Sequence, residues 1–240
     1  MEILNTKNCF ISGATGGLGR SIAKEMYAHG CNLFLTARSE AKLRVLGEEI
    51  LSSADKKRKV YFASGNLHCE KETEKIITTA REQIGKIDIL INTAGIFLVK
   101  KLVDVSLDDL QRSFNINVKA PFIFVKEFSK EMIINGWGRI VNIGSSSAYQ
   151  GFEKTSIYCT TKHALLGLSR SLHAELKEYN VRMFSISPGS IKTAMGKKVK
   201  GQDFDTFIDP DEIAKYIAFV ISFDKQMVSE EIRLNRIDIK

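Results

Sequence analysis

The sequence is poor in cysteine and proline and lacks any long apolar run. It has 4 cysteines and 3 prolines among 240 residues, and no stretch approaches the roughly 18 apolar residues that suggest a membrane-spanning helix. No C-x-x-C pair occurs and no His stands at metal-ligand spacing, so neither a disulfide framework nor a metal site is predicted. The first residues have no basic segment followed by an apolar core, which argues against a secretion signal. We therefore expect a cytoplasmic protein without a metal or a membrane segment.

The chain also lacks a large block of like charge. Its 35 Lys and Arg outweigh its 28 Asp and Glu, for a net charge of +7, but the basic residues are spread along the sequence. Nucleic-acid binding requires basic residues clustered on one face, so it is not predicted. Two short basic segments, residues 56–59 and 197–200, are interpreted as solvated loop charge or as a weak attraction for an anionic substrate or cofactor. With 44% hydrophobic residues, the composition is that of an ordinary folded protein.

Short apolar runs alternate with helical patterns along almost the whole chain. Amphipathic spacing predicts helices over residues 18–29 and 162–178. The strand candidates are Asn8–Ser12, Asn32–Ala37, Lys59–Ser64, Ile87–Asn92, Arg139–Gly144, Arg182–Ser187 and Ile232–Ile237. Strands that alternate with helices form βαβ units and a parallel sheet. Because no linker divides the chain, we predict one α/β domain over residues 1–240: a doubly wound parallel sheet of about seven strands with helices on both faces.

The first predicted strand runs into a glycine-rich turn, GATGGLG at residues 13–19, ahead of a predicted helix. Backbone N–H groups in such a turn can approach a pyrophosphate, and the helix dipole favours the negative charge. The glycines satisfy both G-x-x-x-G-x-G and G-x-x-G-x-x-G but not the usual G-x-G-x-x-G, and no G-K-S/T follows, which excludes a P-loop nucleotidase. Taken alone, the motif leaves a tight turn without a ligand as the alternative.

The end of the second predicted strand carries an arginine where NAD-binding proteins have an acid. That acid stands about 20 residues after the glycine turn and holds the ribose 2′-hydroxyl of NAD. The residues here are Thr36-Ala37-Arg38-Ser39, and a guanidinium suits the 2′-phosphate of NADP through charge-assisted hydrogen bonds. We therefore predict NADP(H) in preference to NAD(H), with a solvated arginine as the alternative.

Residues 139–162 carry the candidate catalytic chemistry. Tyr158 and Lys162 are four residues apart, so they share one face of a helix. An adjacent ammonium stabilises phenolate and is expected to lower the pKa of Tyr158, which helps a tyrosine to exchange protons near pH 7. Ser145 follows a strand and can face the same carboxyl edge of the sheet, where open α/β folds bind ligands.

These motifs together resemble the short-chain dehydrogenase/reductase family, in particular its 3-oxoacyl-acyl-carrier-protein reductases. The resemblance covers the chain from its first strand to about Thr193 and implies a Rossmann fold. The matching elements, in order, are the GATGGLG turn, Asn92-Thr93-Ala94-Gly95 after the fourth strand, Asn117, Ser145, Tyr158, Lys162, and Pro188-Gly189 with Thr193.

The resemblance implies a role for each matching residue. Tyr158 would be the general acid in carbonyl reduction, Lys162 would lower its pKa and bind the nicotinamide ribose, Ser145 would hold the substrate oxygen, and Asn117 would anchor a water in a proton relay. The implied cofactor-binding residues are Gly13, Thr15, Gly17, Leu18, Gly19, Arg38, Asn66, Leu67, Asn92, Ala94, Gly95, Tyr158, Lys162, Pro188, Gly189, Ile191 and Thr193.

Other positions are interpreted as structural, and the tail departs from the family's pattern. Ser146 and Ser147 are expected to be spare hydroxyls in a polar loop, and Phe122, Phe124 and Phe128 are expected in the core. No glycine follows Gly201, so the Gly-Gly loop common near the family's carboxyl terminus is missing. Residues 193–210 are predicted to form a mobile substrate lid.

The resulting hypothesis is an NADP(H)-dependent oxidoreductase that reduces a carbonyl, either a 3-oxoacyl group or another ketone, to an alcohol. The alternatives are an alcohol, sugar or steroid dehydrogenase that works oxidatively, and a non-catalytic NADP-sensing regulator. The resemblance also implies a homodimer or homotetramer acting on a small molecule, with no nucleic-acid or membrane partner.

Overall fold

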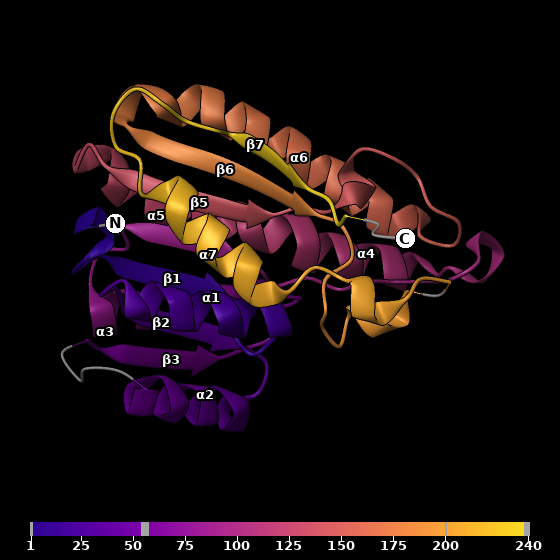
Figure 1. Ribbon diagram of the computed structural model, residues 1–240, viewed down its shortest axis with the longest axis horizontal. Helices are drawn as coiled ribbons and strands as arrows, with labels where there is room; N and C mark the ends of the chain where they lie inside the picture. The colour runs from indigo at the N-terminus through magenta and orange to yellow at the C-terminus, as the bar shows by residue number, and fades with distance from the viewer. Residues whose placement is uncertain (1, 54–57, 200, 238–240) are drawn as a thin grey trace.

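The fold is built on one seven-stranded parallel sheet with the strand order β3-β2-β1-β4-β5-β6-β7 (Figure 1). The computed structural model describes residues 2–53, 58–199 and 201–237; Lys56, Lys57 and Lys200 of the two basic segments lie outside these ranges. The strands are β1 (Asn8–Ser12), β2 (Asn32–Ala37), β3 (Val60–Ser64), β4 (Ile89–Asn92), β5 (Gly138–Ile143), β6 (Val181–Pro188) and β7 (Glu231–Leu234). The predicted doubly wound α/β sheet is therefore confirmed.

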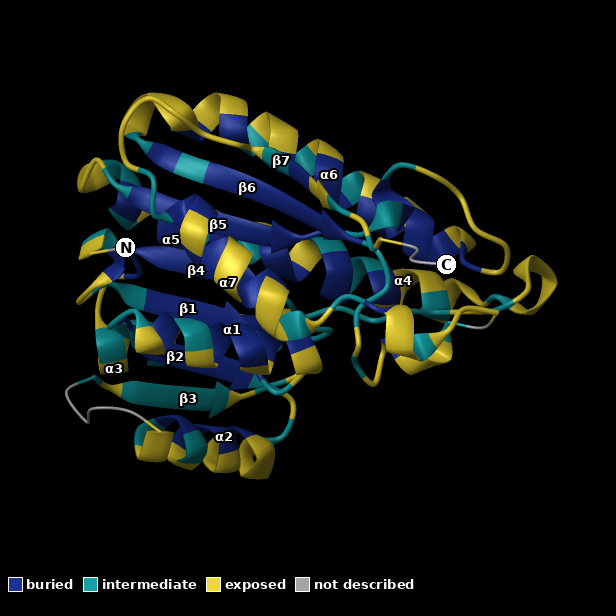
Figure 2. Ribbon diagram, viewed as in Figure 1, coloured by how far each residue is buried: buried dark blue, intermediate teal, exposed yellow. Residues whose placement is uncertain are grey.

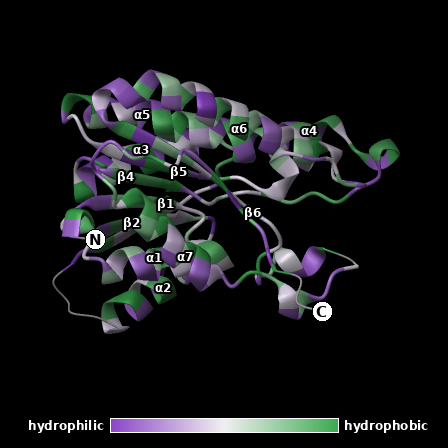
Figure 3. Ribbon diagram, turned by 45° about the horizontal axis from the view of Figure 1, so that its top comes forward, coloured by the Kyte–Doolittle hydropathy of each residue, from purple (hydrophilic) through white to green (hydrophobic). Residues whose placement is uncertain are grey.

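Helices cover both faces of the sheet. They are α1 (Gly17–Ala28), α2 (Glu40–Ser53), α3 (Glu70–Ile84), α4 (Leu107–Phe114), α5 (Ala120–Ile134), α6 (Ser156–Leu176) and α7 (Pro210–Ile221). A π-helical turn, η3 (Asn115–Lys119), joins α4 to α5. Helices α1, α2 and α7 pack on one face, and α3, α5 and α6 pack on the other (Figures 1 and 3).

Successive side chains of each central strand pack alternately against the helices on the two faces of the sheet. Cys9 and Ile11 of β1 point to the layer of α1 and α7, whereas Phe10 between them packs against α5. The Phe10 ring lies 4.9 Å from the ring centroids of both Phe124 and Phe128. Because both faces are covered, β4 and β5 are buried along their whole length and β1 is buried after Asn8 (Figure 2).

The expectation for the three α5 phenylalanines is confirmed for two of them. Phe124 and Phe128 are fully buried, but Phe122 is 43% exposed, so its assignment to the core was wrong. A helix turns about 100° per residue, so a side chain two positions before a core-facing one points away from the core.

A buried arginine closes the amino edge of the sheet. Arg139 of β5 is 0% exposed, and its guanidinium lies 4.4 Å from the ring centroid of Trp137 and donates to the carboxylate of Asp224. It also donates to the backbone carbonyls of Gly138, Asn180, Ile221 and Phe223. The Trp137 indole N–H donates to Asp224 at 3.0 Å, and Lys7 Nζ lies 4.0 Å from the indole ring. This cluster ties the end of α7 to the start of β5.

The register of the strands brings three polar residues together at the carboxyl edge. Ser12 pairs with Asn92, and Asn92 pairs with Asn142. The glycine turn after β1 therefore lies beside the loops that follow β4 and β5. In the part of the chain that the structure describes, no helix is long and apolar enough to cross a membrane.

Candidate active site

The glycine turn between β1 and α1 leaves no room for a side chain at Gly13, Gly17 or Gly19. Gly13 has a φ of +72°, a conformation that favours glycine, and a Cβ there would lie 2.6 Å from the backbone nitrogen of Ala94. A Cβ on Gly17 would lie 2.6 Å from the Thr193 methyl, and one on Gly19 would overlap the Gly13 carbonyl oxygen. The turn is a cradle of bare backbone at the start of α1, the arrangement that suits a pyrophosphate.

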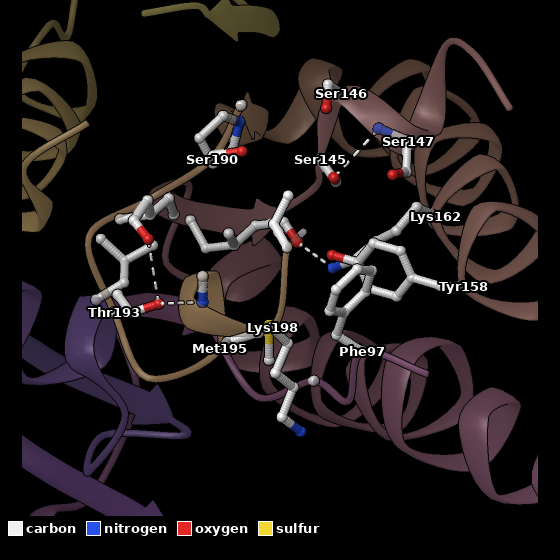
Figure 4. A pocket seen from close by; sticks show the side chains of 18 of the residues that line it. Phe97, Ser145, Ser146, Ser147, Tyr158, Lys162, Ser190, Thr193, Met195 and Lys198 are labelled. Atoms are coloured by element: carbon white, nitrogen blue, oxygen red, sulfur yellow. Dashed lines mark hydrogen bonds between the residues drawn. The ribbon is translucent and has the colours of Figure 1, made fainter. Parts of the chain in front are cut away.

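A cavity of about 540 Å³ runs from this turn to the loop after β5. The sequence-predicted residues that line it are Gly13, Gly17, Leu18, Gly19, Gly95, Ser145, Tyr158, Lys162, Pro188, Gly189, Ile191 and Thr193. In Figure 4, Ser145, Tyr158 and Lys162 lie on one side and Thr193 and Met195 on the other. Ser146 and Ser147, expected to be spare hydroxyls, line the cavity as well.

Tyr158 and Lys162 stand one turn apart on α6, as their spacing predicts. The Tyr158 side chain is nearly buried, its ring centroid lies 4.7 Å from that of Phe97, and it lines the cavity together with Ser145. The Ser145 hydroxyl accepts from the backbone N–H of Ser147 at 3.1 Å. Ser145 and Tyr158 therefore bring two hydroxyl-bearing side chains to the same cavity.

Lys162 is oriented differently from the sequence-based expectation. Its Nζ donates to the backbone carbonyl of Ile143 at 2.7 Å and lies 5.7 Å from the Tyr158 ring centroid (Figure 4). Burial raises the pKa of Tyr158 to about 12, with a smaller opposing effect of Ser145. The expected lowering of this pKa by the neighbouring ammonium is therefore wrong for this structure, because burial dominates and the ammonium is directed at a carbonyl.

The buried ammonium of Lys162 lowers the free energy of unfolding, because burial disfavours its charged form. Burial lowers the pKa of Lys162 to about 8 from an ordinary 10.5. Between these two values the unfolded chain binds a proton that the folded chain does not, so this group makes the free energy of unfolding rise with pH in that window. Below about pH 8 both states are protonated, and the full penalty remains.

We expect Lys162→Met to raise the free energy of unfolding by about 1–2 kcal/mol at pH 7, because it removes a buried charge while keeping an unbranched side chain. The rise in stability between pH 8 and 10 should be smaller in the variant. Urea unfolding of both proteins at pH 7, 8, 9 and 10 measures this. A variant less stable than the parent at pH 7 would contradict it.

Asn117 lies behind Lys162 and does not line the cavity. It is buried in the π-helical turn, and its amide oxygen accepts from the backbone N–H of Ile96 at 2.9 Å. Its Nδ2 donates to the Ile96 carbonyl at 3.1 Å and to the Thr161 hydroxyl at 3.0 Å. Asn117 thus joins the loop after β4 to α6, next to the residues that line the cavity.

Asn92 belongs to a buried polar chain that the sequence analysis did not find in full. Ser12 Oγ donates to Asn92 Oδ1 at 3.4 Å, and Asn92 Nδ2 donates to Asn142 Oδ1 at 2.9 Å. Asn142 Nδ2 continues to the Ser169 hydroxyl on α6 at 2.9 Å. A polar residue within the apolar run RIVNIG was the available signal for Asn142, whereas the role of Ser169 depends on tertiary packing.

The remaining cofactor candidates lie along the carboxyl ends of β2 and β3. Arg38 is exposed just past β2, and among the described residues no hydrogen bond or ion pair to its side chain is found. Asn66 is exposed after β3 and its side-chain oxygen accepts from the backbone N–H of His68, while Leu67 is half-buried. Thr15 and Ala94 belong to the turn and the loop around the cavity without lining it.

The described part of the chain contains four free cysteines, of which Cys9, Cys31 and Cys159 are buried. No group of three or more His, Cys, Asp or Glu side chains able to hold a metal occurs in the same part.

Sequence comparison matches the chain to one family over most of its length. A family model described as short chain dehydrogenase matches residues 7–203. The 3-oxoacyl-acyl-carrier-protein reductase of Aquifex aeolicus (strain VF5) is 32% identical in an alignment of 232 positions that covers 92% of this chain and 93% of that relative. The corresponding reductase of Rickettsia bellii (strain RML369-C) is 29% identical in an alignment of 228 positions that covers 91% of this chain and 90% of that one.

Solved structures with the same fold are also similar in sequence. A blue fluorescent protein from a metagenomic library, in complex with NADPH, has a TM-score of 0.86 and 30% identity, covering 97% of this chain and 96% of its own. An alcohol dehydrogenase from the archaeon Thermococcus sibiricus, complexed with 5-hydroxy-NADP, has a TM-score of 0.87 at 24% identity, covering 97% of both chains. The second likeness concerns the fold alone.

Proposed function

The chain belongs to the short-chain dehydrogenase family of oxidoreductases, and from that premise we propose that it is an NADPH-dependent carbonyl reductase with Tyr158 as the proton donor. The observation that carries the proposal is the pairing of Ser145 and Tyr158 in a cavity continuous with the glycine turn. The Tyr158 phenol is protonated at neutral pH, as the proton donor of a reduction must be.

The hydroxyls of Ser145 and Tyr158 bind the substrate oxygen. Ser145 orients the carbonyl, and Tyr158 transfers its proton as negative charge develops on that oxygen. NADPH supplies the hydride to the carbonyl carbon when it is bound. The Lys162 ammonium, which donates to the Ile143 carbonyl, would hold the ribose hydroxyls of the nicotinamide nucleotide and so position the cofactor beside Tyr158.

The chain's own residues fit a dinucleotide phosphate. The side-chain-free cradle at Gly13, Gly17 and Gly19 leaves backbone N–H groups at the start of α1 for the pyrophosphate. Arg38 would hold the 2′-phosphate of NADPH from the end of β2, where no acid stands to bind a free ribose hydroxyl. A relative of 30% identity binds NADPH, which supports this choice of cofactor.

The larger apolar side chains of the cavity favour a ketone with an apolar substituent. Phe97, Val99, Phe152, Met195 and Val199 line it, together with the polar Glu153, Lys154, Lys198 and Gln202. The apolar side chains bind apolar groups through burial of surface and fix no polar group of the substrate. The 3-oxoacyl reductases among the relatives act on ketones of this kind, so 3-oxoacyl thioesters and simple apolar ketones are the substrates to test first.

Parallel titrations with NADPH and NADH test the cofactor half of the proposal, followed by NADPH oxidation in the presence of ketones. Tight NADPH binding, weak NADH binding and turnover of a ketone are expected. Binding without turnover of any carbonyl or alcohol would favour the regulator, and turnover of alcohols alone would favour an oxidative dehydrogenase.

We expect Arg38→Asp to reduce the preference for NADPH over NADH by about tenfold to a hundredfold. The substitution removes a charge-assisted hydrogen bond to the 2′-phosphate and places a like charge beside it. The ratio of the two dissociation constants measures the effect. Lys225→Asp, the same change of charge at an exposed position near the amino edge, is the control and should leave the ratio unaltered. An unchanged ratio in Arg38→Asp would mean that the 2′-phosphate binds elsewhere.

A further inference from the structure

After β6 the chain forms a loop, here called the lid, of which the structure describes residues 192–199 and 201–207. The lid is closed at its base by a parallel bridge between Ile191 and Ile208. The Lys192 N–H donates to the Ile208 carbonyl, and the Ile208 N–H donates to the Ser190 carbonyl, both at 2.9 Å. Met195, Lys198 and other lid residues line the cavity, so the position of the lid defines its open side.

The carboxyl-terminal segment after β7 contacts the outer half of the lid. Arg236 donates from Nη1 to the Thr206 hydroxyl at 2.8 Å, and its guanidinium carbon lies 5.8 Å from the ring centroid of Phe207. In Figure 1 this end of the chain lies beside the lid, at the carboxyl edge of the sheet. Residues about 30 positions apart in sequence are thereby joined.

Phe207, which Arg236 contacts, also packs against Gly196 in the inner half of the lid. It is only 6% exposed, and its ring lies 3.2 Å from where a Cβ of Gly196 would stand. The Gly196 N–H donates to the Thr193 hydroxyl at 3.1 Å, and the Thr193 methyl group packs on Gly17. A continuous series of contacts therefore leads from Arg236 to the glycine turn.

The segment that carries Arg236 is itself firmly held. The Gly189 N–H donates to the Leu234 carbonyl at 2.8 Å, and Arg233 lies 4.4 Å from the ring centroid of Tyr149, in the loop after β5. Glu231 accepts two hydrogen bonds from Arg170 of α6, at 2.8 and 3.0 Å. The residues just before Arg236 are thus fixed by contacts with β6, α6 and the loop that carries Ser145.

From these contacts we propose that Arg236 is a positioning residue that holds the lid against the cofactor and substrate cleft. The tail does so in a chain that lacks the glycine-rich loop after its last helix. Arg236 touches neither reacting group, so its loss should weaken ligand binding and leave the chemical step intact. The kinetic part of this proposal rests on the proposed carbonyl reductase activity, whereas the part that concerns the lid does not.

Hydrogen–deuterium exchange tests the lid directly, without added ligand. In Arg236→Ala, amides of residues 192–207 should exchange about fivefold faster than in the parent, because the hydrogen bond from Arg236 to Thr206 is lost at a partly exposed site. Amides of β1 and β4 should be unaffected. Arg44→Ala, which removes a guanidinium from an exposed ion pair with Glu40 on α2, is the matched control.

Variants of the acceptor provide a second test. Thr206→Val removes the hydroxyl that Arg236 binds, and Thr206→Ser keeps it. Thr206→Val should accelerate lid exchange as Arg236→Ala does, the double variant should add little, and Thr206→Ser should match the parent. Because the Thr206 hydroxyl also donates to the Asp203 carbonyl at 2.7 Å, the deciding comparison is between Thr206→Val and the double variant. Should Arg236→Ala fold poorly, Arg236→Gln takes its place in both experiments.

Steady-state kinetics complete the test. Arg236→Ala should raise the KM for NADPH and for the ketone about fivefold with kcat nearly unchanged, since only the population of closed lid is altered. If the parent reduces no ketone, the proposed function is wrong. The exchange data alone then test whether Arg236 holds the lid. Unchanged exchange over residues 192–207 in both Arg236→Ala and Thr206→Val would overturn the proposal.

Discussion

Tyr158→Phe is expected to lower kcat for ketone reduction by about a thousandfold while NADPH binding stays within twofold of the parent. A positioned general acid contributes about 10²–10⁴ in rate, and the substitution removes only the hydroxyl. The ring remains, with its edge-to-face contact to Phe97. Stopped-flow measurement of NADPH oxidation gives the rate, and titration of nicotinamide fluorescence gives the affinity.

The matched control for this experiment is Tyr216→Phe. Tyr216 lies on α7 with 38% of its surface exposed, so the loss of its hydroxyl should leave both rate and affinity unaltered. Substantial turnover in Tyr158→Phe would show that another group or a water molecule supplies the proton. Loss of NADPH binding would indicate instead that the phenol holds the cofactor.

The largest expected effect on stability is at Arg139. Arg139→Ala should lower the free energy of unfolding by about 3–5 kcal/mol, because it leaves a cavity and several backbone carbonyls of buried segments without donors. Burial lowers the pKa of Arg139 only to about 10, so the side chain is charged at pH 7 and its hydrogen bonds are charge-assisted. Unfolding in urea at pH 7 measures the loss.

Two further variants define the source of this loss. Arg139→Met retains most of the volume, so the part of the loss that it recovers is due to packing and the rest to hydrogen bonding. Arg44→Ala, at an exposed ion pair, should change stability by less than about 1 kcal/mol. A loss below about 1 kcal/mol in Arg139→Ala would mean that relief of repulsion with Arg182 compensates for the missing hydrogen bonds.

Strands with a continuous apolar run could be predicted almost to the residue. The bounds of β1 and β2 agree with the prediction, and those of β5 and β6 differ from it by one residue at each end. The fourth strand begins two residues later than expected, at Ile89, because the Asp88 side chain accepts from the backbone N–H of Asn8 just before the ladder starts. The residue at which such a strand begins depends on a partner 80 residues away in the sequence.

The positions in the site that line one edge of the sheet could also be predicted, since strand order and motif spacing bring them together. The orientation of Lys162 could not, because it depends on the carbonyl of Ile143 in another segment. Nor could the π-helical turn around Asn117, whose extra residue turns the amide toward Ile96. Sequence periodicity carries no signal for a single such turn.

The cluster around Arg139 has one more consequence, since it contains the chain's single tryptophan. Trp137 lies between Lys7 and Arg139 at the amino edge of the sheet, at the end opposite the cavity. Its emission therefore reports the integrity of that edge, whereas far-ultraviolet circular dichroism averages over all helices and strands. Coincidence of the two melting curves would mean that both edges of the sheet unfold as one cooperative unit.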